Sequence, residues 1–261
     1  PLSKSSIKKI ALVGPLVQAI ADNNGFWSYS WPDDSTRVVS LWKGMINKLG
    51  TASSLIYAKG CEITGQDTSG FKAARQAALE SELTIVSIGE SAIMSGEAKS
   101  RSSLVLPGMQ EQLIKELVAT GKPVVVLISA GRPLVFNWIA DHVPAIVYTW
   151  WLGTEAGNAI SDVLFGDYNP SGKLPMTFPR HEGQIPIYYN YYSTGRPFKN
   201  DSDFFLRTKL SSGLSSDIFY NCLSSSFSWS SYFSHCIYFL RFDKALKDVF
   251  QGNKLLLNFI S

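Results

Sequence analysis

The residue with the clearest chemical potential is Glu97, a carboxylic acid in the loop formed by residues 89–101. The loop follows an apolar run at residues 83–88, which predicts a buried parallel strand. Loops that leave the carboxyl ends of parallel strands are where α/β domains place their chemistry. Small residues flank Glu97, so its carboxyl could swing toward a ligand. On these residues alone, a solvated loop glutamate remains the alternative interpretation.

The elements that must position this loop alternate between strand and helix signals. Apolar runs predict five strands, at residues 7–13, 55–58, 83–88, 124–128 and 145–149, and a short edge strand at 176–178. Helical spacing predicts four helices, on residues 38–49, 71–79, 106–121 and 154–166. The third of these is expected to begin at Leu106-Pro107-Gly108, and Thr154 is expected to cap the fourth.

Strands separated by single helices run parallel, with right-handed crossovers. Near-continuous apolar strands indicate a sheet that is covered on both faces. The sequence therefore predicts the α/β class, as a three-layer α/β/α sandwich of about 190 residues with a mostly parallel sheet.

Bulk composition excludes several classes of function. The chain has 261 residues, of which 45% are hydrophobic and 17% charged, as in an ordinary globular protein. The net charge is only +3 without a clustered basic face, which argues against nucleic acid as a partner. No apolar stretch approaches the roughly 18 residues of a membrane span. The chain opens at Pro1 rather than Met, which indicates a fragment, so the lack of a signal peptide does not reveal its compartment.

Motifs for cofactors and metals are missing. The first predicted strand is not followed by G-x-G-x-x-G, and Walker A, C-x-x-C and G-x-S-x-G patterns are absent, so no cofactor is expected and a flavodoxin-like nucleotide binder is disfavoured. The cysteines lack metal-ligand spacing, so no metal site is predicted, and only Cys222 and Cys236 are close enough in sequence to suggest a disulfide. The three histidines lie far apart and give no support to a Ser-His-Asp triad.

Three stretches carry a family resemblance. They read GKPVVVLISAGRP at residues 121–133, WWLGTEAGNAI at 150–160 and DVLFGDYNPSGKLP at 162–175. Together they closely resemble the C-terminal α/β sandwich domain of the family 3 glycoside hydrolases, and most of all that of bacterial periplasmic β-glucosidases. The resemblance covers roughly residues 5–198.

This resemblance implies a retaining exo-β-glycosidase of carbohydrate metabolism that hydrolyses O-glycosyl bonds in a β-linked glucoside or oligosaccharide, in the periplasm or after secretion. In such enzymes an N-terminal (β/α)8 barrel supplies an aspartate nucleophile, and the sandwich lends the general acid/base. Glu97 occupies the matching position in this sequence. The chemistry fits, because retaining hydrolysis needs two carboxyls about 5–5.5 Å apart.

The resemblance also assigns other site residues. Trp27 matches a tryptophan that flanks the leaving sugar, although a core or interface tryptophan is the alternative; the nearby Trp31 is interpreted as structural. Glu90 is expected to support the loop by hydrogen bonding, and Arg101 to orient the loop or to pair with Glu90. Arg132 is interpreted as structural.

The chain departs from the family pattern in two ways. The barrel is absent, so no nucleophile can be assigned and the chain alone is expected to be inactive. Residues 201–240 contain 12 serines and 10 aromatics without a consistent period, in place of a fibronectin-like domain. We therefore divide the chain into a domain at 1–198 and a divergent or frame-shifted tail at 199–261, irregular in structure unless it forms a small β-rich appendage. The alternative function is a non-catalytic carbohydrate-binding or interaction module, or a non-functional remnant.

Overall fold

A computed structural model describes residues 1–29, 34–52, 54–170, 174–186 and 238–242. Its centre is a sheet with the strand order β2-β1-β3-β4-β5-β6. Five strands pair in parallel: β1 (Ile10–Val13), β2 (Leu55–Ala58), β3 (Leu83–Gly89), β4 (Val124–Ser129) and β5 (Ala145–Tyr148). The sixth strand, β6 (Tyr238–Phe242), pairs antiparallel with β5.

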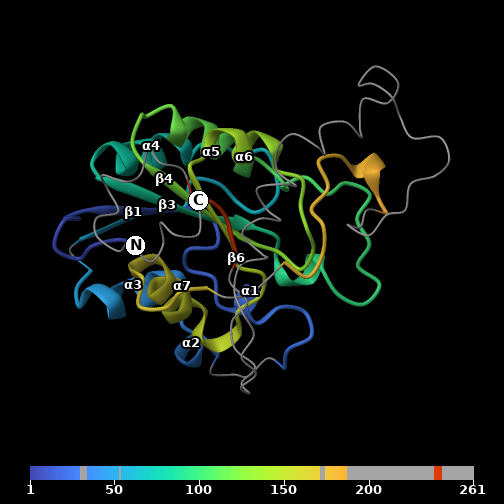
Figure 1. Cartoon of the computed structure of the whole chain (residues 1–261), viewed down its shortest axis with the longest axis horizontal. Coiled ribbons are helices and arrows are strands. Elements are labelled where there is room, and N and C mark those ends of the chain that lie inside the picture. The colour runs from blue at the N-terminus through green and yellow to red at the C-terminus, as the bar shows by residue number, and fades with distance from the viewer. Residues whose placement is uncertain (30–33, 53, 171–173, 187–237, 243–261) are drawn as a thin grey trace.

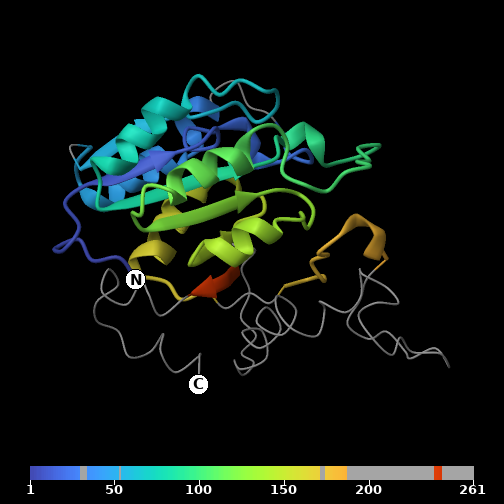
Figure 2. The same ribbon diagram turned by 90° about the horizontal axis from the view of Figure 1, so that it is seen from above.

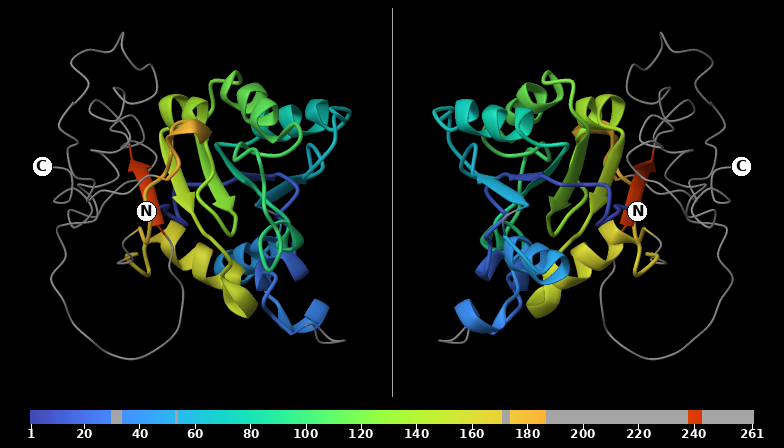
Figure 3. Two further views of the ribbon diagram at one scale, coloured as in Figure 1. Left: turned by 90° about the vertical axis from the view of Figure 1, so that its right-hand side faces the viewer. Right: turned by 90° about the vertical axis from the view of Figure 1, so that its left-hand side faces the viewer.

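Helices cover both faces of the sheet (Figures 1 and 3). One face carries α4 (Phe71–Leu79), α5 (Gln110–Val118) and α6 (Asn137–His142). The other face carries α3 (Leu41–Leu49) and α7 (Ala156–Phe165), with α1 (Ala21–Asn24) and α2 (Asp34–Arg37) nearby. The predicted three-layer α/β/α architecture is confirmed.

Two separate hydrophobic clusters explain why the central strands are apolar throughout. In β4, Val124, Val126 and Ile128 pack in the cluster that includes α4, α5 and α6. The intervening Val125 and Leu127 pack in the other cluster, with α3 and α7. Because successive side chains of a strand point to opposite faces, a sheet buried on both sides needs apolar residues at nearly every position.

The crossing of α3 and α7 depends on glycine. A Cβ added at Gly44 would collide with the backbone of Gly157, and a Cβ added at Gly157 would collide with the carbonyl of Ser40. Ser40 also caps α3, since its side chain accepts a hydrogen bond from the N–H of Lys43 at 3.3 Å. The two helices therefore approach each other backbone to backbone.

Several predicted boundaries were wrong. Residues 176–178 form no strand, because Phe178 is held by its ring, 4.8 Å from that of Tyr148, rather than by a backbone ladder. The first strand starts at Ile10 rather than at residue 7, since the N–H of Lys8 is bonded to the side chain of Glu82 at 2.7 Å. The fifth strand ends one residue early, at Tyr148.

Two helix starts also differ from the prediction. Thr154 does not cap α7 but lies in a 3-10 turn, Gly153–Glu155, where its carbonyl accepts from the N–H of Val39 at 2.7 Å. The helix expected to begin at residues 106–108 begins at Gln110, after Gly108 adopts a positive φ of 62°. Helix α6 was not anticipated at all.

No helix within the described ranges is both long and apolar enough to span a membrane. The same ranges hold no cluster of three or more His, Cys, Asp or Glu side chains that could bind a metal ion. Trp31, Cys222, Cys236 and most of the tail lie outside the described residues, so the disulfide and the reading-frame hypothesis stay predictions. The exception is β6, a regular element inside a tail expected to be irregular.

Candidate active site

The loop that carries Glu97 begins where β3 and β4 end side by side. Gly89 and Ser129 are register partners, and Gly89 has a φ of 142° at which a Cβ would collide with the Ser129 backbone. The buried side chain of Gln110 fixes this strand end, because it accepts from the N–H of Gly89 and donates to its carbonyl, both at 2.8 Å. Figure 2 shows the loop, coloured green, projecting beyond the end of the sheet.

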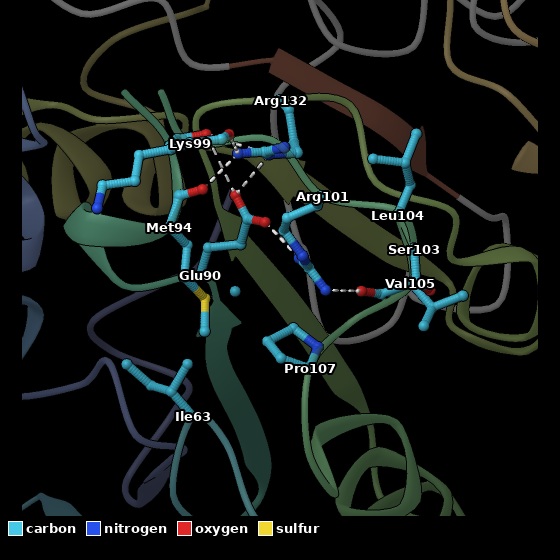
Figure 4. Close-up of polar contacts among 12 residues, drawn as sticks. Ile63, Glu90, Met94, Lys99, Arg101, Ser103, Leu104, Val105, Pro107 and Arg132 are labelled. Carbon is cyan, nitrogen blue, oxygen red and sulfur yellow. Dashed lines mark hydrogen bonds and ion pairs between the residues drawn. The ribbon is translucent and has the colours of Figure 1, made fainter. Parts of the chain in front are cut away.

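Glu90 is fully buried and is the charged centre of the loop's anchorage (Figure 4). Its carboxylate forms an ion pair with Nη1 of Arg101 through Oε1, and a second with Nε of Arg132 at 3.3 Å through Oε2. The hydroxyl of Ser95 lies 3.4 Å from Oε2. A buried carboxylate is tolerated only when it is paired and hydrogen-bonded, and here two guanidinium groups supply both.

The two arginines use their remaining donors on loop backbone. Nη2 of Arg132 donates to the carbonyl of Met94 and, at 3.0 Å, to that of Lys99. Nη2 of Arg101 donates to the carbonyl of Val105 at 3.2 Å. The loop is therefore tied to Glu90 through both guanidinium groups.

Tyr148 on β5 holds the backbone of Arg132, since its hydroxyl donates to the Arg132 carbonyl. Burial raises the pKa of Tyr148, so the hydroxyl remains protonated and able to donate. Sequence reasoning treated Arg132 as structural and missed that it reaches across to the loop after the neighbouring strand. The available signal was its place three residues beyond the carboxyl end of β4.

The far end of the loop has a separate anchor in Glu182. Its carboxylate accepts from the hydroxyl of Ser103 at 2.7 Å and from the N–H of Leu104 at 2.5 Å. The hydrogen bond from Ser103 and then that from Leu104 lower the pKa of Glu182. Nearby, Val105 forms a parallel bridge with Val135. Sequence reasoning missed Glu182, because its partners lie about eighty residues away in the chain.

Glu97 lies at the exposed tip of the loop. It is followed by Ala98 in a left-handed conformation with a φ of 55°, and the turn is closed by a 3.1 Å hydrogen bond from the N–H of Lys99 to the carbonyl of Gly96. The Glu97 carboxylate forms no hydrogen bond or ion pair with any residue in the described part of the chain.

Trp27 lies on the neighbouring loop and is 75% exposed, so it is not part of the core of this chain. Its ring contacts that of Phe26 edge to face, with centroids 5.2 Å apart. A Cβ at Gly96 would collide with the ring of Phe26, so the loops of Trp27 and Glu97 pack directly against each other. The N–H of Ala92 also donates to Asp22 at 2.8 Å. The two loops thus present a carboxyl and an indole at the same end of the sheet.

Trp151 is a further residue that sequence reasoning missed. A Cβ at Gly25 would come within 2.9 Å of its ring, and a Cβ at Gly131 within 2.8 Å of its Nε1. The indole therefore fills the space between the loop of Trp27 and the loop of Arg132. Its position just after the carboxyl end of β5 was the signal that could have found it.

Comparison with known proteins finds a matching family model and related sequences. The model of the glycosyl hydrolase family 3 C-terminal domain matches residues 1–210. A periplasmic beta-glucosidase of Salmonella typhimurium is 42% identical over 218 residues, which cover 76% of this chain and 28% of that protein. A beta-xylosidase of Formosa agariphila is 39% identical, over 72% of this chain and 26% of that protein.

Solved structures of similar fold are also found. The beta-glucosidase from Listeria innocua in complex with isofagomine has a TM-score of 0.69 and 36% identity, and the match covers 77% of this chain and 27% of that one. The chain therefore spans about a quarter of the length of the curated relatives it matches.

Proposed function

Because this chain belongs to glycosyl hydrolase family 3 through its C-terminal domain, we propose that it is the acid/base-bearing domain of a retaining exo-β-glycosidase of β-glucosidase type. Glu97 is the proposed general acid/base, and Trp27 the proposed contact to the leaving sugar. A β-linked glucoside or oligosaccharide is the proposed substrate, which the names of the relatives support.

One observation carries the proposal: Glu97 is an exposed carboxyl without a partner among the described residues, on a loop whose two ends are anchored, beside an exposed indole. A glutamate that served only structure would be expected to bond to the scaffold, as Glu90 and Glu182 do. An exposed indole gives the apolar C–H face of a sugar ring a surface to pack against.

In the proposed mechanism, Glu97 acts twice. Its protonated carboxyl first gives a proton to the departing glycosidic oxygen while a second carboxyl attacks the anomeric carbon. The Glu97 carboxylate then removes a proton from the water that hydrolyses the glycosyl-enzyme intermediate. Glu90 and Arg101 support these steps by anchoring the loop.

The attacking carboxyl is proposed to come from an N-terminal (β/α)8 barrel, since this chain corresponds to only about a quarter of its relatives. The barrel would have to bring its carboxyl within about 5–5.5 Å of Glu97 and exclude water from the exposed loop. Alone, the chain is proposed to be inactive.

The proposal keeps the domain at residues 1–198 and the divergent tail at 199–261. The family match runs to residue 210, and residues 187–237 lie outside the described part of the chain. A periplasmic or secreted location is proposed from the name of the Salmonella relative.

The experiment joins this chain to the part of the Salmonella beta-glucosidase that precedes its matched region. Activity is measured on an alkyl β-glucoside, whose poor leaving group needs protonation, and on 2,4-dinitrophenyl β-glucoside, whose leaving group does not. Glu97→Gln should lower kcat/KM for the alkyl glucoside by about 10²- to 10⁴-fold and for the activated glucoside far less.

The matched control is Glu111→Gln, the same change at a partly exposed glutamate on α5, which should leave both rates unchanged. Equal losses on the two substrates would contradict the acid role. Turnover of the activated glucoside by the unjoined chain would contradict the need for a barrel.

A further inference from the structure

A single side chain joins the two ends of the segment that carries Glu97. Nη2 of Arg132 donates to the carbonyl of Met94 on one side of Glu97 and to that of Lys99 on the other. Nε of the same guanidinium lies 3.2 Å from the hydroxyl of Ser95. Figure 4 shows Arg132 reaching these loop groups from the segment after β4. The residues between these contacts are therefore held as a closed turn.

We propose that Arg132 is a positioning residue that fixes the orientation of Glu97, an inference that rests on the proposed function. Arg132 acts through the loop backbone and is not assigned any contact with substrate. Its effect is to hold the turn that contains Gly96 against Phe26, and so to keep Glu97 beside the loop of Trp27.

Charge favours this arrangement. Glu90 supplies one negative charge to two guanidinium groups, so these three side chains together carry one surplus positive charge. The positively charged guanidinium of Arg132 donates hydrogen bonds to the carbonyl oxygens of Met94 and Lys99. Hydrogen bonds from a charged donor are roughly twice as strong as those between neutral groups, so these contacts restrain an otherwise exposed turn.

Geometry requires arginine rather than any cation. The planar guanidinium donates in several fixed directions, which allows Nε to face Glu90 and Ser95 while Nη2 faces the two carbonyls. A lysine ammonium is a single point charge and would keep the pairing with Glu90 without joining both ends of the turn. Arg132→Lys therefore separates the effect of the positive charge from the effect of holding the turn.

The first test needs no catalytic activity. Hydrogen exchange is measured on the whole 261-residue chain, with attention to the N–H groups of Met94 and Lys99, which are bonded within the loop. Arg132→Gln should speed their exchange by about tenfold or more, since hydrogen bonds to a charged donor are lost. The matched control is Arg75→Gln at an exposed arginine on α4, which should leave that exchange unchanged.

The second test uses the fusion protein and the two glucosides described above. Arg132→Gln should lower kcat for the alkyl glucoside by about 10- to 100-fold more than for the activated one, because a misplaced acid fails only where protonation is needed. Arg132→Lys should restore most of the thermal stability that Arg132→Gln loses. It should not restore the rate on the alkyl glucoside relative to that on the activated one. If Arg132→Gln does not fold, hydrogen exchange and the rates on the two glucosides are both measured on Arg132→Lys.

The outcomes separate this inference from the proposed function. Unchanged exchange at Met94 and Lys99, equal losses on the two glucosides, or full rescue by lysine would overturn the positioning role. If Glu97→Gln itself shows no selectivity for leaving group, the acid role fails, and the exchange experiment still decides whether Arg132 holds the loop.

Discussion

Glu90→Gln is the change that most directly tests the anchorage of the loop. The substitution keeps the shape of the side chain, so it opens no cavity, but it removes the charge that pairs with Arg101 and Arg132. It also replaces one acceptor oxygen by an N–H₂ group that must face a guanidinium donor. Both arginines then lose their ion pair with Glu90.

The magnitude follows from burial. Glu90 is 0% exposed, while the side chains of Arg101 and Arg132 are 20% and 17% exposed. Removing one partner of a buried ion pair costs about 3–5 kcal/mol. Because water reaches the two guanidinium groups in part, we expect the lower end, about 3 kcal/mol. In a domain of this size that corresponds to a fall in Tm of about 6–12 °C.

The assay is urea unfolding followed by circular dichroism, with the free energy of unfolding taken from the linear extrapolation. Glu111→Gln is the matched control, since Glu111 pairs with Lys115 one helical turn away and both side chains are 36% exposed. That pair is worth about 0.5 kcal/mol or less. If Glu90→Gln costs no more than Glu111→Gln, Glu90 does not anchor the loop and the reasoning is wrong.

Two further predictions concern the packing and the pH response of the scaffold. Gly157→Ala should destabilise the chain by about 1–3 kcal/mol in the same urea assay, because the new Cβ meets the backbone carbonyl of Ser40, which cannot rotate away; an unchanged midpoint would show that α3 and α7 can separate at no cost. Hydrogen bonds from Ser103 and Leu104 lower the pKa of Glu182 from 4.5, so this carboxylate stabilises the fold above that pH and the stabilisation is lost as the pH falls through the lower folded value. Glu182→Gln should therefore reduce the loss of stability between about pH 6 and about pH 3, and an equal loss in both proteins would contradict the assignment.

The layered fold could be predicted from the sequence because the buried strands are recognisable as continuous apolar runs. The runs in β3 and β4 are apolar at nearly every position, which only a sheet covered on both faces requires. Helix ends were harder to predict. Thr154 has the right residue type for a cap, but its segment is held by a backbone bond to Val39 that no local pattern encodes.

The candidate site was predictable only in part for the same reason. Glu97 and Glu90 could be singled out because both lie in the loop that follows one strand and because the family resemblance pointed to Glu97. The roles of Arg132, Trp151 and Glu182 depend on contacts between loops that are distant in sequence and adjacent in space. Such contacts follow from the strand order of the sheet, which residue types alone do not specify.

The pairing of Gly89 with Ser129 has a consequence for how such a site can change over time. A shift of one residue between these strands would turn every following side chain to the opposite face, and the glutamate and the arginine that now meet would part. The register of these two strands therefore determines which side chains meet in the loops at their carboxyl ends. Substitutions at the tip of the turn can therefore change which side chains the loop displays, while the paired strands beneath keep the position of the loop unchanged.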